Sequence, residues 1–272
     1  MTEGEKEAMP EREASPETKR LLAVCGKGGT GKTAFAAMMS RVLMESGRAG
    51  KLLLIDADPA LGLPNTMGIK VKRTMGQIRE NIIKTARSGD QEKKAQIADM
   101  LDYMVLEALV ETDTYALLAM GRTETLGCFC PVNDLLRGAV ETLSRSFDTI
   151  IIDGEAGVEQ INRQVVRRMD KLIIVSDATA RSLQTADLIR RMVREDKVIT
   201  CGGLGLIFNR VQGNEDLLAQ AARELELEVL GYVPQDQIIA HFDLTAKPLI
   251  DLPMESAGLA AVRQIVEKHI LS

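Results

Sequence analysis

Short apolar runs alternate with longer amphipathic stretches along most of this 272-residue chain. Runs rich in Leu, Ile and Val predict strands that are buried on both faces of a sheet. The stretches between them place apolar residues three or four positions apart, which predicts helices covered on one side. The expected strands are residues 21–25, 51–56, 115–120, 149–153, 172–176, 204–209 and 229–233. The expected helices are residues 33–45, 133–145, 181–195, 214–225 and 255–271.

This alternation predicts a three-layer α/β fold, with a mostly parallel, twisted sheet flanked by helices. Residues 21–272 are expected to form one domain, into which residues 74–112 insert two amphipathic helices. Residues 57–68 and 121–131 are predicted loops, and Asn133 is expected to cap the helix that follows it.

Residues 1–20 are rich in Glu, Lys, Arg and Pro without an apolar period, which predicts a flexible, charged tail with no role in catalysis. The formal net charge of −5 argues against a protein that coats nucleic acid, because such a protein normally carries a basic surface. No apolar run approaches the roughly 18 residues of a membrane span, and no signal peptide is visible. We therefore expect a cytoplasmic protein with reduced thiols.

A glycine-rich segment between the first strand and the first helix fits the phosphate-loop pattern G-x-x-x-x-G-K-S/T. It consists of Gly26, Lys27, Gly28, Gly29, Thr30, Gly31, Lys32 and Thr33. Glycines let backbone N–H groups converge on phosphate oxygens, and the start of the following helix favours an anion. Lys32 adds a positive charge near the β and γ phosphates, and Thr33 offers a hydroxyl to Mg²⁺. The segment predicts a P-loop ATPase that uses ATP and Mg²⁺.

Acidic residues follow two of the expected strands: Asp56 and Asp58 come after one, and Asp153 ends another. The carboxyl ends of parallel strands meet at the edge of the sheet where ligands bind. These acids are therefore expected to support Mg²⁺, partly through water. Spacing alone does not separate the role of Asp56 from that of Asp58. Lys27 is either a second cation for the γ-phosphate or a solvated loop lysine.

The run from Lys27 to Thr33 resembles the deviant Walker A motif of the MinD/ParA and nitrogenase iron-protein group. Asp56–Pro59 and Asp153–Gly157 are similar to the two switch segments of that group. Asn209 resembles its adenine-binding asparagine, and Tyr232–Pro234 resembles the segment that lines its adenine pocket. The resemblance covers nearly all of the chain after the tail.

Several roles are implied by this resemblance. Lys27 would reach across a dimer interface to the partner's nucleotide, so that two subunits of a homodimer enclose two ATP molecules. Asp58 would position or activate the attacking water. Asn209 and Pro234 would contact the adenine.

The segment Gly127–Pro131 contains the pair Cys128 and Cys130. Together with Ala156–Gln160 it resembles the accessory ATPases that help insert nickel into carbon monoxide dehydrogenase, which implies a client enzyme of that type. Phe129 and the residues after Cys130 depart from that pattern. In an extended segment the two thiolates would point to one side, and a two-fold dimer would supply four ligands. Such ligands suit Ni²⁺, Zn²⁺ or Cu⁺ without choosing among them.

Other interpretations remain open at this point. Both cysteines of the pair could be small buried hydrophobes. Cys25 and Cys201 are expected to be structural. A positioning ATPase of the MinD or ParA type would act on a membrane or on DNA, although clustered basic residues for nucleic acid are scarce. An iron–sulfur reductase would carry a cysteine after the second switch, and residues 158–169 contain none. Residues 74–112 either recognise a client or only pack.

Overall fold

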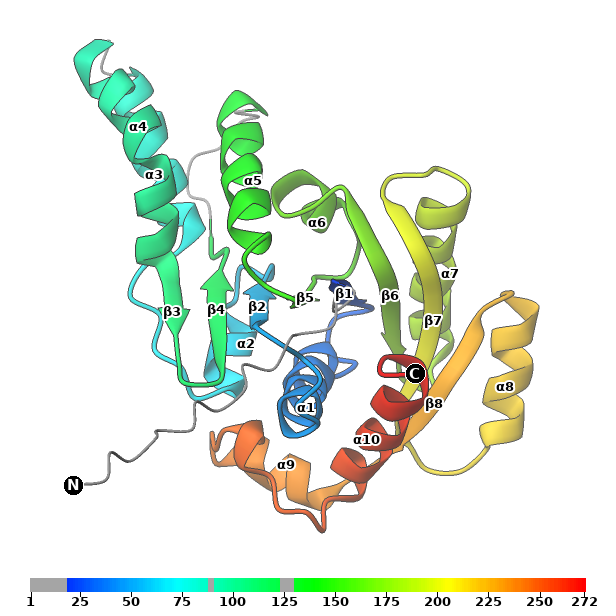
Figure 1. Ribbon diagram of the computed structural model, residues 1–272. Helices are drawn as coiled ribbons and strands as arrows, with labels where there is room; N and C mark the ends of the chain where they lie inside the picture. Colours follow the sequence, from blue (N-terminus) through cyan, green and yellow to red (C-terminus); the bar gives the residue numbers. More distant parts are fainter. Residues whose placement is uncertain (1–18, 88–90, 123–129) are drawn as a thin grey trace, which may run out of the picture.

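A computed structural model describes residues 19–87, 91–122 and 130–272, and within these residues eight strands form a single sheet (Figure 1). The strands are β1 (Arg20–Cys25), β2 (Leu52–Asp56), β3 (Leu109–Glu111), β4 (Tyr115–Ala119), β5 (Thr149–Asp153), β6 (Arg168–Ser176), β7 (Thr200–Val211) and β8 (Glu228–Pro234). Their order across the sheet is β3-β4-β2-β5-β1-β6-β7-β8, and every neighbouring pair is parallel except β3 and β4.

Helices cover both faces of this sheet, which confirms the expected three-layer fold class (Figure 1). They are α1 (Lys32–Glu45), α2 (Gly62–Thr66), α3 (Met75–Arg87), α4 (Gln91–Ala108), α5 (Cys130–Ser144), α6 (Glu159–Gln164), α7 (Ala180–Arg194), α8 (Glu215–Glu224), α9 (Gln237–Leu244), the 3₁₀ helix η1 (Leu249–Asp251) and α10 (Ala257–His269). Alternate residues of β1 enter the two cores: Ala23 and Cys25 pack with α3 to α8, and Leu22 and Val24 pack with α1, α2, η1 and α10.

The structure corrects several sequence-based boundaries. The segment 57–68 is not wholly a loop, because it contains α2. The two helices predicted within residues 74–112 are confirmed, but this stretch ends in β3, which pairs antiparallel with β4. Helix α5 begins before Asn133, whose Oδ1 instead accepts a hydrogen bond from Arg79 Nε at 2.9 Å. Asn133 therefore links α5 to α3 and is not the cap of its own helix.

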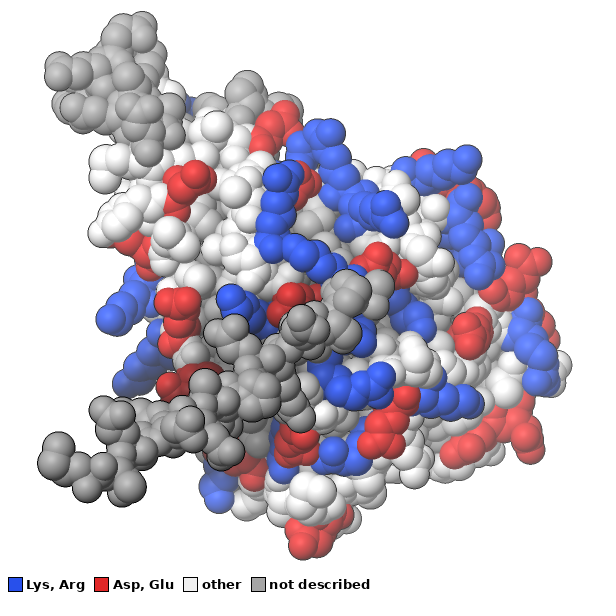
Figure 2. Space-filling model, in the orientation of Figure 1, with Lys and Arg blue, Asp and Glu red and all other residues white. Residues whose placement is uncertain are grey.

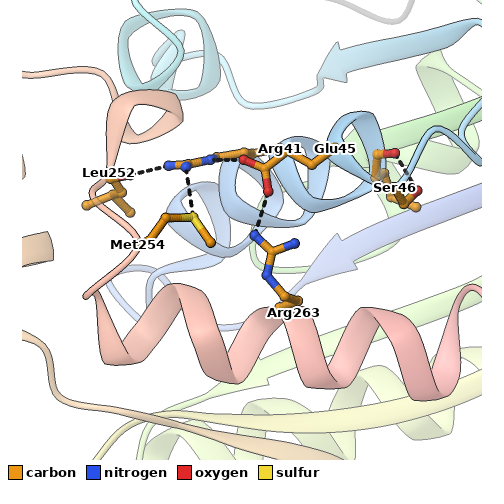
Figure 3. Close-up of polar contacts among 7 residues, drawn as sticks. Arg41, Glu45, Ser46, Leu252, Met254 and Arg263 are labelled. Carbon is orange, nitrogen blue, oxygen red and sulfur yellow. Dashed lines mark hydrogen bonds and ion pairs between the residues drawn. The ribbon is translucent and has the colours of Figure 1, made fainter.

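Polar contacts fix α10 against α1, the helix that follows the phosphate loop (Figure 3). Glu45 of α1 pairs with Arg41 one turn earlier at 2.7 Å and with Arg263 of α10. Arg41 also donates to the carbonyl oxygen of Leu252, which follows η1, and contacts Met254 Sδ at 3.7 Å. Burial raises the pKa of Glu45, but hydrogen bonds from the two arginines outweigh it and the net shift is downward. The C-terminal helix thus supports the element that carries the phosphate loop.

Candidate nucleotide site

The phosphate loop connects β1 directly to α1, and two of its glycines are required by the backbone. Gly26 has a φ of 143°, and a Cβ atom there would lie 2.1 Å from the carbonyl oxygen of Val175. Gly31 has a φ of 91°, and its Cβ would lie 2.3 Å from Asn209 Nδ2. These contacts are shorter than any non-bonded approach allows, so any larger residue would displace the loop from β6 or β7.

Side chains at the end of β7 hold the loop in place. Asn209 Nδ2 donates to the carbonyl oxygen of Thr30 at 2.8 Å, and Arg210 Nη2 donates to that of Gly29, also at 2.8 Å. Within the loop, Thr30 Oγ1 donates to the carbonyl oxygen of Lys27 at 2.9 Å. Three polar anchors therefore fix carbonyl groups of the loop. The resemblance predicted Asn209 only as an adenine contact, and sequence reasoning did not identify Arg210.

A cleft of about 920 Å³ opens beside the loop. This volume lies at the upper end of the range of small-ligand sites, roughly 300–1,000 Å³, so a nucleoside triphosphate fits it. Its walls come from the loop and the start of α1, from the ends of β7 and β8, and from α9 with the turn after it. Of the residues predicted to bind nucleotide, the cleft is lined by Gly28, Gly29, Gly31, Lys32, Thr33, Asp58, Asn209 and Pro234.

Two buried carboxylates lie side by side next to the loop. Asp56 and Asp153 are opposite each other in the register of β2 and β5, and neither is exposed to solvent. Asp56 accepts hydrogen bonds from the backbone N–H groups of Asp58 at 2.9 Å and Leu63 at 3.1 Å. The two carboxylate oxygens of Asp153 are buried without a hydrogen-bond partner of ordinary geometry within the described part of the chain. An oxygen pair left this way calls for an additional ligand.

The electrostatics of the two acids follow from their burial. Burial raises the pKa of Asp153 to about 7; the hydroxyl of Thr33 and the charge of Lys32 oppose the rise, and the charge of Asp56 adds to it. Burial also raises the pKa of Asp56 to about 6, against the hydrogen bonds from Asp58 and Leu63. The ionised forms of both carboxylates therefore lack enough nearby positive charge to offset the cost of their burial.

The residues present fit a magnesium ion. Mg²⁺ prefers oxygen ligands and keeps several of its waters, so it needs few groups from the protein. The hydroxyl of Thr33 and the partnerless oxygens of Asp153 supply such groups, and Asp56 lies on the neighbouring strand. A divalent cation here would also remove the energetic cost of two buried negative charges.

The remaining predicted residues of the loop and the first switch lie around this centre. Lys27 is partly buried in the loop. Burial raises the pKa of Asp177, but hydrogen bonds from Thr179 and Ser182, with a smaller contribution from the charge of Lys27, make the net shift downward. Asp58 lines the cleft, and its Oδ1 accepts the N–H of Ala60 at 2.9 Å.

The four cysteines have different positions. Cys128 lies outside the described residues, and Cys130 is the first residue of α5, with its side chain also outside the description. Cys25 is buried in β1, where burial, helped by the nearby charge of Asp153, raises its thiol pKa to about 12. Cys201 is half-buried in β7, and its Sγ donates to the carbonyl oxygen of Gly203. Cys25 therefore stays a thiol, and the structure does not test the predicted pair.

No helix in the described ranges is both long and apolar enough to cross a membrane.

Comparisons with known proteins agree with this geometry. Residues 19–198 match the family model described as an AAA domain. An uncharacterized ATP-binding protein of Methanocaldococcus jannaschii is 37% identical over 251 residues, which cover 92% of this chain and 98% of the relative. The carbon monoxide dehydrogenase accessory protein CooC of Rhodospirillum rubrum is 28% identical over 240 residues, covering 85% of this chain and 89% of CooC.

Solved structures share the fold. The septum site-determining protein MinD of Pyrococcus horikoshii, complexed with Mg-ADP, superposes with a TM-score of 0.63 at 22% identity over 91% of this chain and 94% of MinD. A ParA family ATPase from Chlorobium tepidum superposes with a TM-score of 0.67 at 17% identity, covering 91% of this chain and 97% of its own. The chain belongs to the AAA domain family and is a P-loop ATPase, with the fold that the MinD and ParA structures share.

Proposed function

We propose that this ATPase works as a Mg²⁺-dependent homodimer that helps insert nickel into a client enzyme of the carbon monoxide dehydrogenase type. The observation that carries the ATP-dependent part is the partnerless, buried carboxylate of Asp153 beside a braced phosphate loop. The nickel-dependent part is supported by the likeness to CooC over most of both chains and by the Cys-x-Cys pair.

In this proposal each residue has one task. Lys32 and the N–H groups of the loop bind the phosphates, and Thr33, Asp56 and Asp153 hold Mg²⁺, the two acids partly through water. The ion supplies positive charge to the phosphate oxygens during hydrolysis. Asp58 orients the attacking water from the cleft wall, and Lys27 reaches the nucleotide of the partner subunit.

For hydrolysis to change the shape of the protein, contacts must connect the phosphate site to the rest of the chain. The backbone N–H of Ala57 donates to the carbonyl oxygen of Asp153 at 2.9 Å, and that of Gly154 donates to the carbonyl oxygen of Val24 at 2.8 Å. The two switch-like segments and the start of the loop are thus tied together. When the γ-phosphate leaves, a shift in one segment is transmitted to the other, which is the kind of order change known in nucleotide switches. We propose that this shift opens the dimer.

Nickel is the cargo in this scheme. Cys128 and Cys130 of each subunit supply two thiolates, and the closed dimer brings four together. The closed, ATP-bound dimer then holds nickel, and opening after hydrolysis releases it to the client.

The test is the nickel content of the purified protein by elemental analysis, with and without a non-hydrolysable ATP analogue. We expect about one nickel per dimer with the analogue, from four thiolates shared by two subunits. The double variant Cys128→Ser, Cys130→Ser should lose this nickel, and the control Cys201→Ser should keep it. Nickel that is absent, or that survives the double substitution, contradicts the cargo role. A brown protein that contains iron would instead favour an iron–sulfur reductase.

A further inference from the structure

A second hollow, of about 570 Å³, lies apart from the nucleotide cleft, between α5, α6 and the starts of β6 and β7. We call it the basic pocket. It is lined by Arg137, Glu159, Asn162, Arg167, Lys197, Val198, Ile199 and Thr200. Lys and Arg side chains gather over this part of the surface, around α6 and the first residues of β6 and β7 (Figure 2). Nothing in the proposed hydrolysis uses these residues.

The pocket has a surplus of positive charge facing solvent. Arg167 is 70% exposed, and its ion pair with Asp134 is long, at 3.9 Å. Asp134 is shared, because it also pairs with Arg137, whose side chain is 11% exposed. Lys197 is exposed and lies in the turn before β7, where its backbone has a φ of 50°. Of the residues that line the pocket, Arg137, Arg167 and Lys197 are cationic and Glu159 is acidic, and Asp134 pairs with the two arginines.

The N-terminal segment, residues 1–18, has the opposite charge. It contains six glutamates against one lysine and one arginine, with Glu11, Glu13 and Glu17 nearest to the fold. A segment of this composition complements a basic surface.

The sheet register puts the end of this segment close to the pocket. Leu22 pairs with Lys171, and Lys171 pairs with Gly203, so Lys19 lies level with Thr200 of the pocket, two strands away. Two strand spacings amount to about 10 Å. An extended chain covers about 3.3 Å per residue, so Glu13 reaches up to about 20 Å from Lys19. Glu11, Glu13 and Glu17 can therefore reach the pocket of their own chain.

We propose that the acidic N-terminal segment docks into the basic pocket of its own chain through contacts of its glutamates with Arg167 and Lys197. Glu159 and Asn162 of the pocket belong to α6, the helix that directly follows the switch-like segment Asp153–Gly157. The docked segment therefore restrains α6, and this step rests on the proposed function, in which the segment before α6 shifts when the γ-phosphate leaves. Docking is independent of the proposed cargo, since it involves neither nickel nor Cys128 and Cys130.

The experiment uses the full chain and trypsin, because Lys6 and Arg12 are the cleavage sites within the segment. The rate of cleavage after Arg12, followed by mass spectrometry, is compared with that of a free peptide of residues 1–18. The test variant is Arg167→Glu, Lys197→Asn, which leaves the segment unchanged and keeps a residue tolerant of positive φ at position 197. The matched control is Arg223→Glu, Lys268→Asn, which makes the same change at exposed positions of α8 and α10.

If a few exposed ion pairs hold the docked segment, trypsin should cleave after Arg12 about fivefold to tenfold more slowly in the protein than in the peptide. The control variant keeps this protection, and the test variant loses it and hydrolyses ATP faster. Raising the salt to about 0.5 M should remove the protection from the unmodified protein, which tests docking without any substitution. Cleavage of the unmodified protein at the rate of the peptide, or protection that persists in the test variant, overturns the proposal. Protection that vanishes on dilution assigns the pocket to the segment of another copy and overturns docking within one chain. An unchanged hydrolysis rate after release overturns the restraint on α6.

Discussion

Replacing Asp153 with an asparagine should stabilise the nucleotide-free protein at neutral pH while abolishing hydrolysis. Asp153 ends the central strand β5, is fully buried, and has two carboxylate oxygens without partners in the described structure. Burial raises its pKa from 3.8 to about 7. At about 1.4 kcal/mol per pH unit, ionising Asp153 in the folded protein costs at most about 4 kcal/mol, and relaxation around the charge reduces this to about 2–4 kcal/mol.

The sign of the pH dependence follows from the raised pKa. The folded protein binds the proton of Asp153 more tightly than the unfolded chain does, so the free energy of unfolding falls as the pH rises from 3.8 to about 7. The amide side chain introduced by Asp153→Asn carries no charge at any pH and avoids this loss. The advantage of the variant should therefore grow by about 2–3 kcal/mol between pH 5 and pH 8.

Urea unfolding followed by circular dichroism measures this difference, in EDTA and without nucleotide. Comparing the two pH values cancels the constant effect of placing an amide in the core. The exposed substitution Asp102→Asn on α4 controls for the loss of one negative charge. An advantage that stays constant between pH 5 and pH 8 would refute the reasoning, because Asp153 would then ionise in the fold as it does in water.

Three other substitutions test neighbouring parts of the account. Gly31→Ala should remove ATP binding, measured by calorimetry, because its Cβ would lie 2.3 Å from Asn209 Nδ2. Arg210→Ala removes the anchor of the Gly29 carbonyl and should weaken ATP binding about tenfold, as the loss of one charged hydrogen bond does; unchanged affinity would contradict the bracing role. Glu45→Gln should cost about 0.5–1 kcal/mol of stability at pH 7, and this cost should shrink as the pH falls below 4.5 and through the lowered pKa of Glu45, because the contribution depends on the ionised form.

The sequence predicted the central strands well because their residues are apolar on both faces, as in β2 and β5. It failed where the sheet meets solvent. The first residues of β6 are Arg168, Met169, Asp170 and Lys171, which look like a loop because the rim of the sheet is exposed. Strand β3 has three residues and is stabilised by pairing with β4, so no local pattern signals it.

Some residues of the candidate site could likewise be predicted from the sequence, and others could not. The phosphate loop, Asp56 and Asp153 follow from motif and strand ends, since their chemistry depends on spacing along the chain. Arg210 donates to the carbonyl oxygen of a loop residue that lies 181 positions earlier in the sequence, and the backbone of Arg210 itself has a φ of 58°. A contact of that kind depends on the pairing of distant strands and leaves no local signal. The left-handed backbone of Arg210 is visible only in the folded chain.

The central claim, that two subunits share their ATP sites, is tested most directly by mixing two inactive variants. Lys27→Ala removes the cation given to the partner, and Lys32→Ala inactivates a subunit's own site. In a mixed dimer, the Lys27→Ala subunit keeps Lys32 and receives Lys27 from its partner. With random pairing, half of the dimers regain one of two sites, so an equal mixture should hydrolyse ATP at about a quarter of the unmodified rate. A mixture as inactive as its two components would contradict the shared site.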